Sequence, residues 1–309
     1  MVRKTVGLAS AGVLALGLGL AAGAQAQAQP ADTSATSAAC ALRLGSVTAN
    51  GAHTSRMINA TAPITIGGVR GTANVFTPGQ VQHTTTFVGT PLLSGESRSG
   101  LTVLGGALHS SSYVVDGQSQ IDPHYPKNNL RIGGGWSNYR WVEQSVHRPA
   151  DAGSPSRTTL YGQQTDGTVL RWIADGTRWR LSGGAGGLST VKSMTLISRT
   201  DTYETFLANT RAGGLLTVRW PTRYLGVPKG TAVRDATWQG FEQLIATKCG
   251  VNGTLLLGID RDTKSGYLYA VGHANGRNTV IKGLGKVPMT FSDPQYFRWA
   301  PKYDTLLGD

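Results

Sequence analysis

The chain has 309 residues, of which 29 are Lys or Arg and 17 are Asp or Glu, giving a formal net charge of +12. Such a basic protein is expected either to associate with anionic surfaces, such as anionic cell-envelope polymers, or simply to stay in solution through its charge. The basic residues are scattered in runs no longer than two, so the charge predicts no specific nucleic-acid partner.

The amino-terminal residues have the pattern of a secretory signal peptide. A short positive region precedes a mostly apolar run at 6–22, and Ala24 and Ala26 supply the small side chains that a signal peptidase reads. A transmembrane anchor is the weaker alternative, because a cleavage site follows a run that is only mildly hydrophobic. We therefore expect a secreted protein without a transmembrane segment. Its expected parts are a signal peptide at 1–26, a flexible leader at 27–40 and a single domain at 41–309.

Two cysteines remain in the mature chain, Cys40 and Cys249. An oxidising compartment favours a disulfide between them, which would join the amino-terminal arm to the body of the domain. There is no CxxC pair and no third cysteine, so neither a thiolate metal site nor a cysteine nucleophile is indicated. No cofactor is expected.

The region from residue 41 onward predicts an all-β domain. Glycine, threonine and valine are frequent there, only four glutamates occur, and no twelve-residue segment carries helix formers at helical spacing. The clearest unit is 238–271, where apolar runs of five or six residues are bounded by Gly, Asn and Asp. This unit predicts a small antiparallel meander whose polar segment 260–266 is a turn. That segment lacks the sixth-position glycine and the late acidic residue of an EF-hand, so it predicts no calcium site.

The meander recurs along the chain at intervals of about 50 residues. Its aromatic anchor, Trp238 followed by Phe241, matches Trp136 followed by Tyr139, and the two copies are 238 − 136 = 102 residues apart. The Arg-Trp pairs at 171–172 and 219–220 mark a later strand of two units, and 266–271 lies at the next expected place. Weaker copies of the anchor are assigned to Val191–Met194, to Thr84–Phe87 and to the segment that begins at Phe291.

A repeat of this length predicts a β-propeller, because a single meander cannot bury both faces and must pack against its copies. The 269 residues from 41 to 309 give about 54 per unit for five four-stranded blades. Only 19 residues follow from Phe291, so the last blade must be completed by amino-terminal strands within Ala41 to His83. A linear β-solenoid and a pair of β-sandwiches are the alternatives.

The repeats resemble those of the tachylectin-like five-bladed propeller lectins. The resemblance is carried by Gly133–Arg140 (GGGWSNYR) with 166–170, and by 237–241 (TWQGF) with 266–271 (GYLYAV). It covers two blades well and a third moderately, and Val191 stands where those lectins have a Trp. The resemblance implies a secreted lectin that binds N-acetylated amino sugars in pockets between neighbouring blades and catalyses no reaction.

Sugar recognition needs an aromatic face together with amide or carboxylate groups for the hydroxyls. Trp136 and Asn138 lie at alternate positions of an extended segment and can face one ligand, whereas the adjacent Trp238 and Gln239 would need a turn to do so. The alternative is that both tryptophans pack between blades. The candidate ligand-binding residues are Trp136, Asn138, Tyr139, Trp238, Gln239 and Phe241.

The function expected from the sequence is glycan or cell-wall amino-sugar binding without catalysis. One alternative is a propeller glycoside hydrolase or lyase, which needs two carboxyl groups in a central funnel. The other is a protein-binding propeller at the cell surface. The six histidines are dispersed with no HxH or HExxH, so no metal site is indicated. The candidate funnel carboxylates are Asp116, Glu143, Asp201, Glu204 and Glu242.

Overall fold

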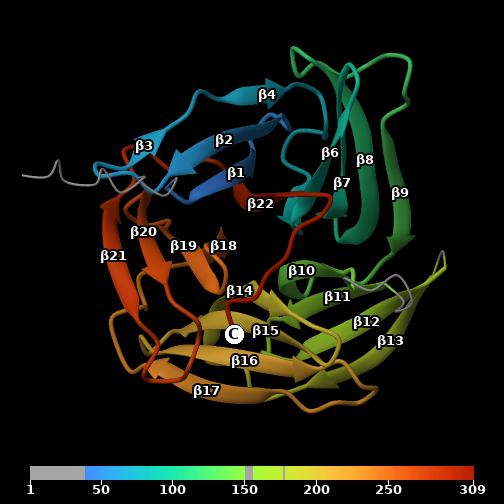
Figure 1. Cartoon of the computed structure of the whole chain (residues 1–309). Coiled ribbons are helices and arrows are strands. Elements are labelled where there is room, and N and C mark those ends of the chain that lie inside the picture. The colour runs from blue at the N-terminus through green and yellow to red at the C-terminus, as the bar shows by residue number, and fades with distance from the viewer. Residues whose placement is uncertain (1–38, 150–155, 177) are drawn as a thin grey trace, which may run out of the picture. The chain divides into compact units, whose positions relative to one another are not determined.

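The computed structural model describes residues 39–149, 156–176 and 178–309, which belong to one compact unit, Ala38–Asp309. The expected signal peptide and nearly all of the expected leader lie outside the described residues. The unit is a five-bladed β-propeller, as the repeat predicted, and Figure 1 shows its blades around a common centre. Three blades are separate four-stranded sheets, and the other two are joined in one ten-stranded sheet by the parallel pairing of a strand from each. No helix in the described ranges is long and apolar enough to cross a membrane.

Each blade is an antiparallel meander, and the strands are numbered along the chain. Blade 1 contains β22 (Gln295–Pro301), β1 (Ala41–Val47), β2 (His53–Asn59), β3 (Thr65–Ile66) and β4 (Arg70–Thr72). Blade 2 contains β5 (Val81–Thr84), β6 (Phe87–Leu92), β7 (Gly95–Leu104), β8 (Ala107–Asp116) and β9 (Asn128–Gly133). Blade 3 contains β10 (Tyr139–His147), β11 (Arg157–Gln164), β12 (Val169–Asp175) and β13 (Arg178–Ala185). Blade 4 contains β14 (Val191–Arg199), β15 (Tyr203–Thr210), β16 (Leu215–Pro221) and β17 (Lys229–Arg234). Blade 5 contains β18 (Gln243–Cys249), β19 (Gly253–Asp260), β20 (Ser265–Val271) and β21 (Ile281–Lys286).

The ring is closed by strands from the two ends of the domain. β22 pairs antiparallel with β1, with Gly45 opposite Phe297, so amino-terminal strands complete the blade that the carboxyl-terminal strand begins. The predicted disulfide is also present and joins Cys40, just before β1, to Cys249 at the end of β18. It therefore links blade 1 to blade 5, as expected from the closure of the ring.

The hydrophobic core is divided into five clusters, each between two neighbouring blades. Between blades 4 and 5, for example, Leu207 and Val233 meet Trp238 and Leu256. The alternation of buried and less buried residues along the strands explains this arrangement, because each sheet presents side chains to both neighbours. Packing between blades is thus the main apolar contact that holds the ring.

A backbone hydrogen bond repeats where one blade leads into the next, and it corrects one of the predicted anchors. The carbonyl of a hairpin turn accepts the N–H of the anchor residue, as Gly106 does from Trp136 and Gly213 does from Trp238, both at 3.0 Å. Gly51 accepts in the same way from Phe76, so the anchor that leads into blade 2 is Phe76 and not Thr84–Phe87.

The predicted anchor of blade 4, Val191–Met194, is also wrong. The N–H of Tyr139 donates to the carbonyl of Trp136 in a four-residue turn, and Phe241 does the same to Trp238. Val191 donates in this way to Leu188. The anchor is therefore Leu188, and Val191–Met194 begins the inner strand instead. Leu188 is aliphatic, so the aromatic pattern of the other anchors does not mark this position.

After β22 the chain runs across the inner strands to β14 and β15, where it ends (Figure 1). Gly308 donates its N–H to the carbonyl of Ile197 at 2.9 Å, and Leu306 is buried in the cluster between blades 3 and 4. Asp304 accepts hydrogen bonds from Arg199 and Arg298, which come from two different inner strands. The carboxyl-terminal segment therefore ties together blades that are not adjacent in sequence.

Candidate functional site

The predicted sugar-binding aromatics are all buried between blades. Trp136 is 7% exposed and stacks near Tyr139 and Trp172, with ring centroids 4.3 and 5.1 Å away. Trp238 is 5% exposed and packs against Phe241 and Tyr269. This burial favours the packing role for these aromatics, and their role in sugar binding stays a prediction.

The two predicted polar partners, Asn138 and Gln239, are exposed beside these tryptophans. Each uses its backbone carbonyl to join structural elements: that of Asn138 accepts from the N–H of Thr165, and that of Gln239 accepts from Lys192. None of the six predicted residues lines either of the two cavities described below.

The first cavity lies at the centre of the ring and has a volume of about 260 Å³. Its walls come from the inner strands of all five blades. Most of its polar side chains hold neighbouring blades together. His83 donates from Nε2 to the carbonyl of Tyr139 at 2.7 Å, Arg140 donates to the carbonyl of Val191 at 2.7 Å, and Lys192 pairs with Glu242.

Of the two glutamates in this cavity, Glu143 is the one with an oxygen that accepts no hydrogen bond from the described residues. Its Oε1 accepts the backbone N–H groups of Thr86 at 3.0 Å and Gln144 at 2.8 Å, and no hydrogen bond to Oε2 is formed by the described residues. Burial raises the pKa of Glu143, and this effect outweighs the opposing hydrogen bonds and the charge of Arg298. A carboxyl group in this state can donate a proton.

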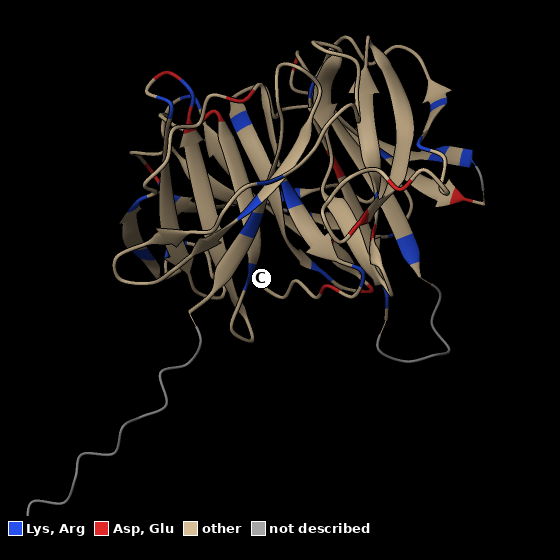
Figure 2. Ribbon diagram, turned by 90° about the horizontal axis from the view of Figure 1, so that it is seen from above, with Lys and Arg blue, Asp and Glu red and all other residues tan. Residues whose placement is uncertain are grey.

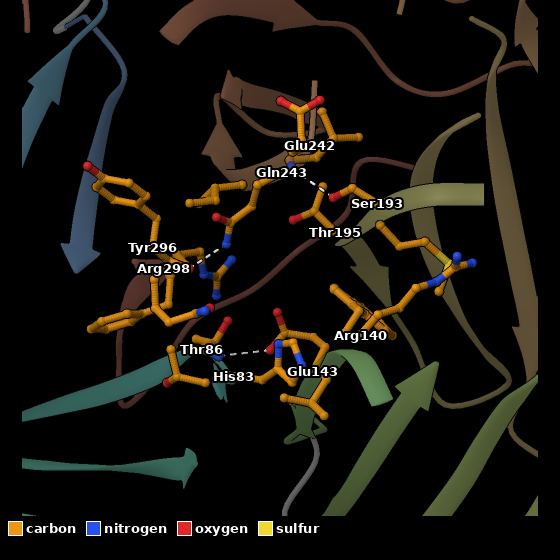
Figure 3. Close-up of a pocket in the computed structure, with 18 of the residues that line it drawn as sticks. His83, Thr86, Arg140, Glu143, Ser193, Thr195, Glu242, Gln243, Tyr296 and Arg298 are labelled. Carbon is orange, nitrogen blue, oxygen red and sulfur yellow. Dashed lines mark hydrogen bonds between the residues drawn. The ribbon is translucent and has the colours of Figure 1, made fainter. Parts of the chain in front are cut away.

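The remaining candidate carboxylates are each held by other groups. Glu242 lies on the opposite side of the cavity in Figure 3, and its oxygens accept from Lys192 and from the N–H of Arg261. Glu204 is buried away from the cavity, where Ser145, Arg157 and Tyr161 donate to it. Asp201 is largely exposed and pairs with His147.

The fifth candidate, Asp116, caps its own turn, with Oδ1 accepting the N–H groups of Gln118 and Gln120. Only two of the five candidates therefore line the central cavity. In the ranges that the structure describes, no three His, Cys, Asp or Glu side chains are grouped as a metal site would require.

The second cavity lies between blades 1 and 2 and has a volume of about 410 Å³. The strand register determines which side chains face it. Arg43 is paired with Met57, and Ser55 is paired with Arg70, so these four share the face of blade 1 that meets blade 2. From the other side, Glu96 and Arg98 alternate along β7 and present their side chains to blade 1.

A charged network forms one wall of this cavity. Arg43 binds both oxygens of Glu96, with Nη1 2.6 Å from Oε1 and Nη2 3.0 Å from Oε2. Arg98 donates from Nε to Oε2 of Glu96 at 2.8 Å and from Nη1 to Thr72 at 2.9 Å. Both guanidinium groups lie over the ring of Trp299, at 4.9 and 5.1 Å from its centroid.

The network fixes the charge of Glu96. Burial opposes ionisation, but hydrogen bonds and charges from Arg43 and Arg98 outweigh it and lower the pKa of Glu96. The carboxylate therefore stays ionised, and it holds two arginines in defined positions. Because Arg98 is only 2% exposed, its orientation is set before any ligand arrives.

The cavity also has apolar surface. Met57, Pro91 and Val115 line it beside the charged groups. Ring C–H groups of a sugar can rest on such surface while its hydroxyls bind the guanidinium and carboxylate groups. The volume is within the range of small-molecule sites.

No motif in the sequence marks this cavity. The alternation of Glu96 and Arg98 on one strand was the available signal, since both must then face the same neighbour. Arg43 is 53 residues from Glu96 in the chain and reaches it only because the ring places blade 1 beside blade 2.

Comparison with known proteins gives no match to a family model and no match to a curated protein. Solved structures do resemble the chain. The SapL1 lectin in complex with alpha methyl fucoside is 13% identical, with coverage of 80% of this chain and 76% of that one and a TM-score of 0.45.

Two further solved structures also resemble the chain. The fucose-specific lectin of Aleuria aurantia is 12% identical over 76% of this chain and 74% of that one, with a TM-score of 0.42. The alpha-L-arabinofuranosidase of Podospora anserina is 9% identical over 75% and 78%, with a TM-score of 0.46. Since all three scores are below 0.5, the assignment of a five-bladed propeller rests on the strand pairing of this chain itself.

Proposed function

We propose that this protein is a secreted lectin-like propeller that binds glycans in the cavity between blades 1 and 2. The observation that carries the proposal is the Arg43–Glu96–Arg98 network, fixed over Trp299 on the wall of a cavity of about 410 Å³. A preorganised set of charged donors and acceptors binds hydroxyl groups without first having to be ordered.

The arrangement supports binding rather than turnover. Both oxygens of Glu96 are held by arginines that lower its pKa, so it is a poor proton donor at neutral pH. Asp116, the other carboxylate at this cavity, accepts two N–H groups of its own turn.

The experiment is a glycan-array screen of the mature protein, followed by titration calorimetry on the sugars that bind. Arg43→Gln and Met57→Ala, both at the cavity, are expected to weaken binding about tenfold or more, through loss of the ion pair that positions Glu96 and through lost apolar contact respectively. Val251→Ala is the control, because Val251 is 75% exposed in the turn between β18 and β19. Full binding by both cavity variants, or no binding to any glycan, would contradict the proposal.

A glycoside hydrolase is the second candidate function, and Glu143 favours it. Its pKa is raised, and its Oε2 has no hydrogen-bond partner among the described residues, as a general acid in a central funnel requires. The test is release of reducing ends from a panel of plant and cell-wall polysaccharides. Release that disappears in Glu143→Gln would support the hydrolase, and no product from any polymer would remove it.

A further inference from the structure

The cavity between blades 1 and 2 carries more positive than negative charge. Arg43, Arg70 and Arg98 face it, whereas Glu96 is the only carboxylate within its charged network. Arg56 also contributes to the lining, but its guanidinium turns away and approaches the sulfur of Met289. Asp116 also lines the cavity, so the three guanidinium groups and two carboxylates leave an excess of one positive charge.

The donors of this network are not equally available to a ligand. Glu96 occupies both terminal nitrogens of Arg43 and the Nε of Arg98, and Thr72 accepts from Nη1 of Arg98. Arg98 is only 2% exposed, whereas Arg70 is exposed and its guanidinium makes no hydrogen bond within the described part of the chain. Arg70 is exposed on β4, opposite Ser55 in the register, so its whole planar fork is free.

We propose that this cavity selects sugars that carry a carboxylate, that is, uronic-acid-type residues of an acidic glycan. This inference rests on the proposed function and names its ligand class. The two oxygens of a carboxylate match the fork of Arg70, which is exposed at the cavity. A neutral sugar leaves the charge of Arg70 without a partner and is expected to bind more weakly.

The net charge of the whole protein is a competing explanation, because any basic protein attracts polyanions. Lys and Arg lie on many strands around the ring (Figure 2), so a general attraction would not depend on one of them. Arg178, which is exposed on β13 of blade 3, provides a matched control: Arg178→Gln removes the same charge as Arg70→Gln at a distant place.

The experiment compares galacturonate and glucuronate oligosaccharides with their carboxyl-reduced forms, which keep the linkages and lose the charge. Titration at physiological salt is expected to give at least about tenfold tighter binding of the charged forms. Arg70→Gln is expected to remove that preference by weakening binding of the charged forms at least about tenfold, while Arg178→Gln keeps the preference. Thermal unfolding confirms that both variants are folded.

Four results would overturn the inference. Equal binding of charged and reduced forms, still lost in Arg43→Gln, would leave a lectin for neutral sugars. Equal weakening by Arg70→Gln and Arg178→Gln would assign the preference to overall charge. Sulfated oligosaccharides that bind while uronates do not would assign the cavity to a different anion. Absence of binding to any oligosaccharide would remove the proposed function together with the inference.

Discussion

Arg43 of β1 and Glu96 of β7 form a bidentate ion pair, at 2.6 and 3.0 Å, between the blade that closes the ring and the blade beside it. Arg98 binds the same carboxylate. The Arg43–Glu96 pair has two effects. It fastens blade 1 to blade 2, and it shapes the wall of the cavity to which we assign glycan binding. Stability and binding should therefore respond together when Glu96 is changed.

Glu96→Gln is expected to destabilise the protein at neutral pH by about 2 to 3 kcal/mol, because it leaves the buried Arg98 without its counter-charge. The lowered pKa of Glu96 sets the pH dependence. Its contribution is present above the ordinary carboxyl pKa of 4.5 and is lost as the pH falls through the lower folded value. Urea unfolding at several pH values should show the wild-type advantage shrinking in acid. An advantage that stays constant with pH would contradict this role.

The structure predicts the opposite pH dependence for Glu143. Because the folded pKa of Glu143 is raised by burial, the native state binds the proton more tightly than the unfolded state. Wild-type stability should fall as the pH rises above 4.5 toward the folded pKa. Glu143→Gln keeps an acceptor for Thr86 and Gln144, so it should lack this decline and be the more stable protein near neutrality. Identical urea midpoints for the two proteins across this range would show that the carboxyl group is not perturbed.

The disulfide is expected to be a large contributor to stability. Cys40 and Cys249 are separated by 209 positions, and closing such a loop in the unfolded chain corresponds to at most about 5 kcal/mol. The double variant Cys40→Ala/Cys249→Ala should therefore unfold at a much lower urea concentration. The wild type measured under reducing conditions serves as the matched comparison and should behave alike. A double variant with the wild-type midpoint would mean that the ring closes without help from this bond.

Trp238 tests the division between packing and binding. Trp238→Ala removes a side chain buried between blades 4 and 5 and should cost about 3 to 5 kcal/mol. Trp238→Phe should cost less and leave glycan affinity unchanged, because the proposed site lies between blades 1 and 2. A folded Trp238→Phe protein that no longer binds glycan would show that Trp238 is part of the sugar-binding site.

The sequence was informative about the ring because ring formation depends on repeated local patterns. The strands of the unit at 238–271 lie where the apolar runs predicted them. The repeat that begins at Phe291 is too short to form a blade, so its completion by amino-terminal strands could be predicted, and β1 does pair with β22. Anchors were missed where the pattern lost its aromatic residue, as at Leu188, or where its spacing changed, as at Phe76. In both places a backbone hydrogen bond or turn keeps the geometry without the expected side-chain pattern.

The candidate site was harder to predict for a physical reason. A cavity between blades combines residues from different repeats, and within the Arg43–Glu96–Arg98 network only Glu96 and Arg98 share a strand. Tryptophan is the usual signal of a sugar site, but Trp136 and Trp238 are needed to fill the space between blades. The charged groups that face the cavity carry no such signal, because an isolated arginine in a sequence resembles any solvated one.

Hydrogen–deuterium exchange with and without a glycan from the array locates the ligand most directly. Binding in the cavity between blades 1 and 2 predicts slowed exchange in β2, β4, the β6–β7 hairpin and the turn after β8, with the other blades unchanged. Slowed exchange confined to the inner strands β10, β14 and β18, or to the segments around Trp136 and Trp238, would contradict the assignment.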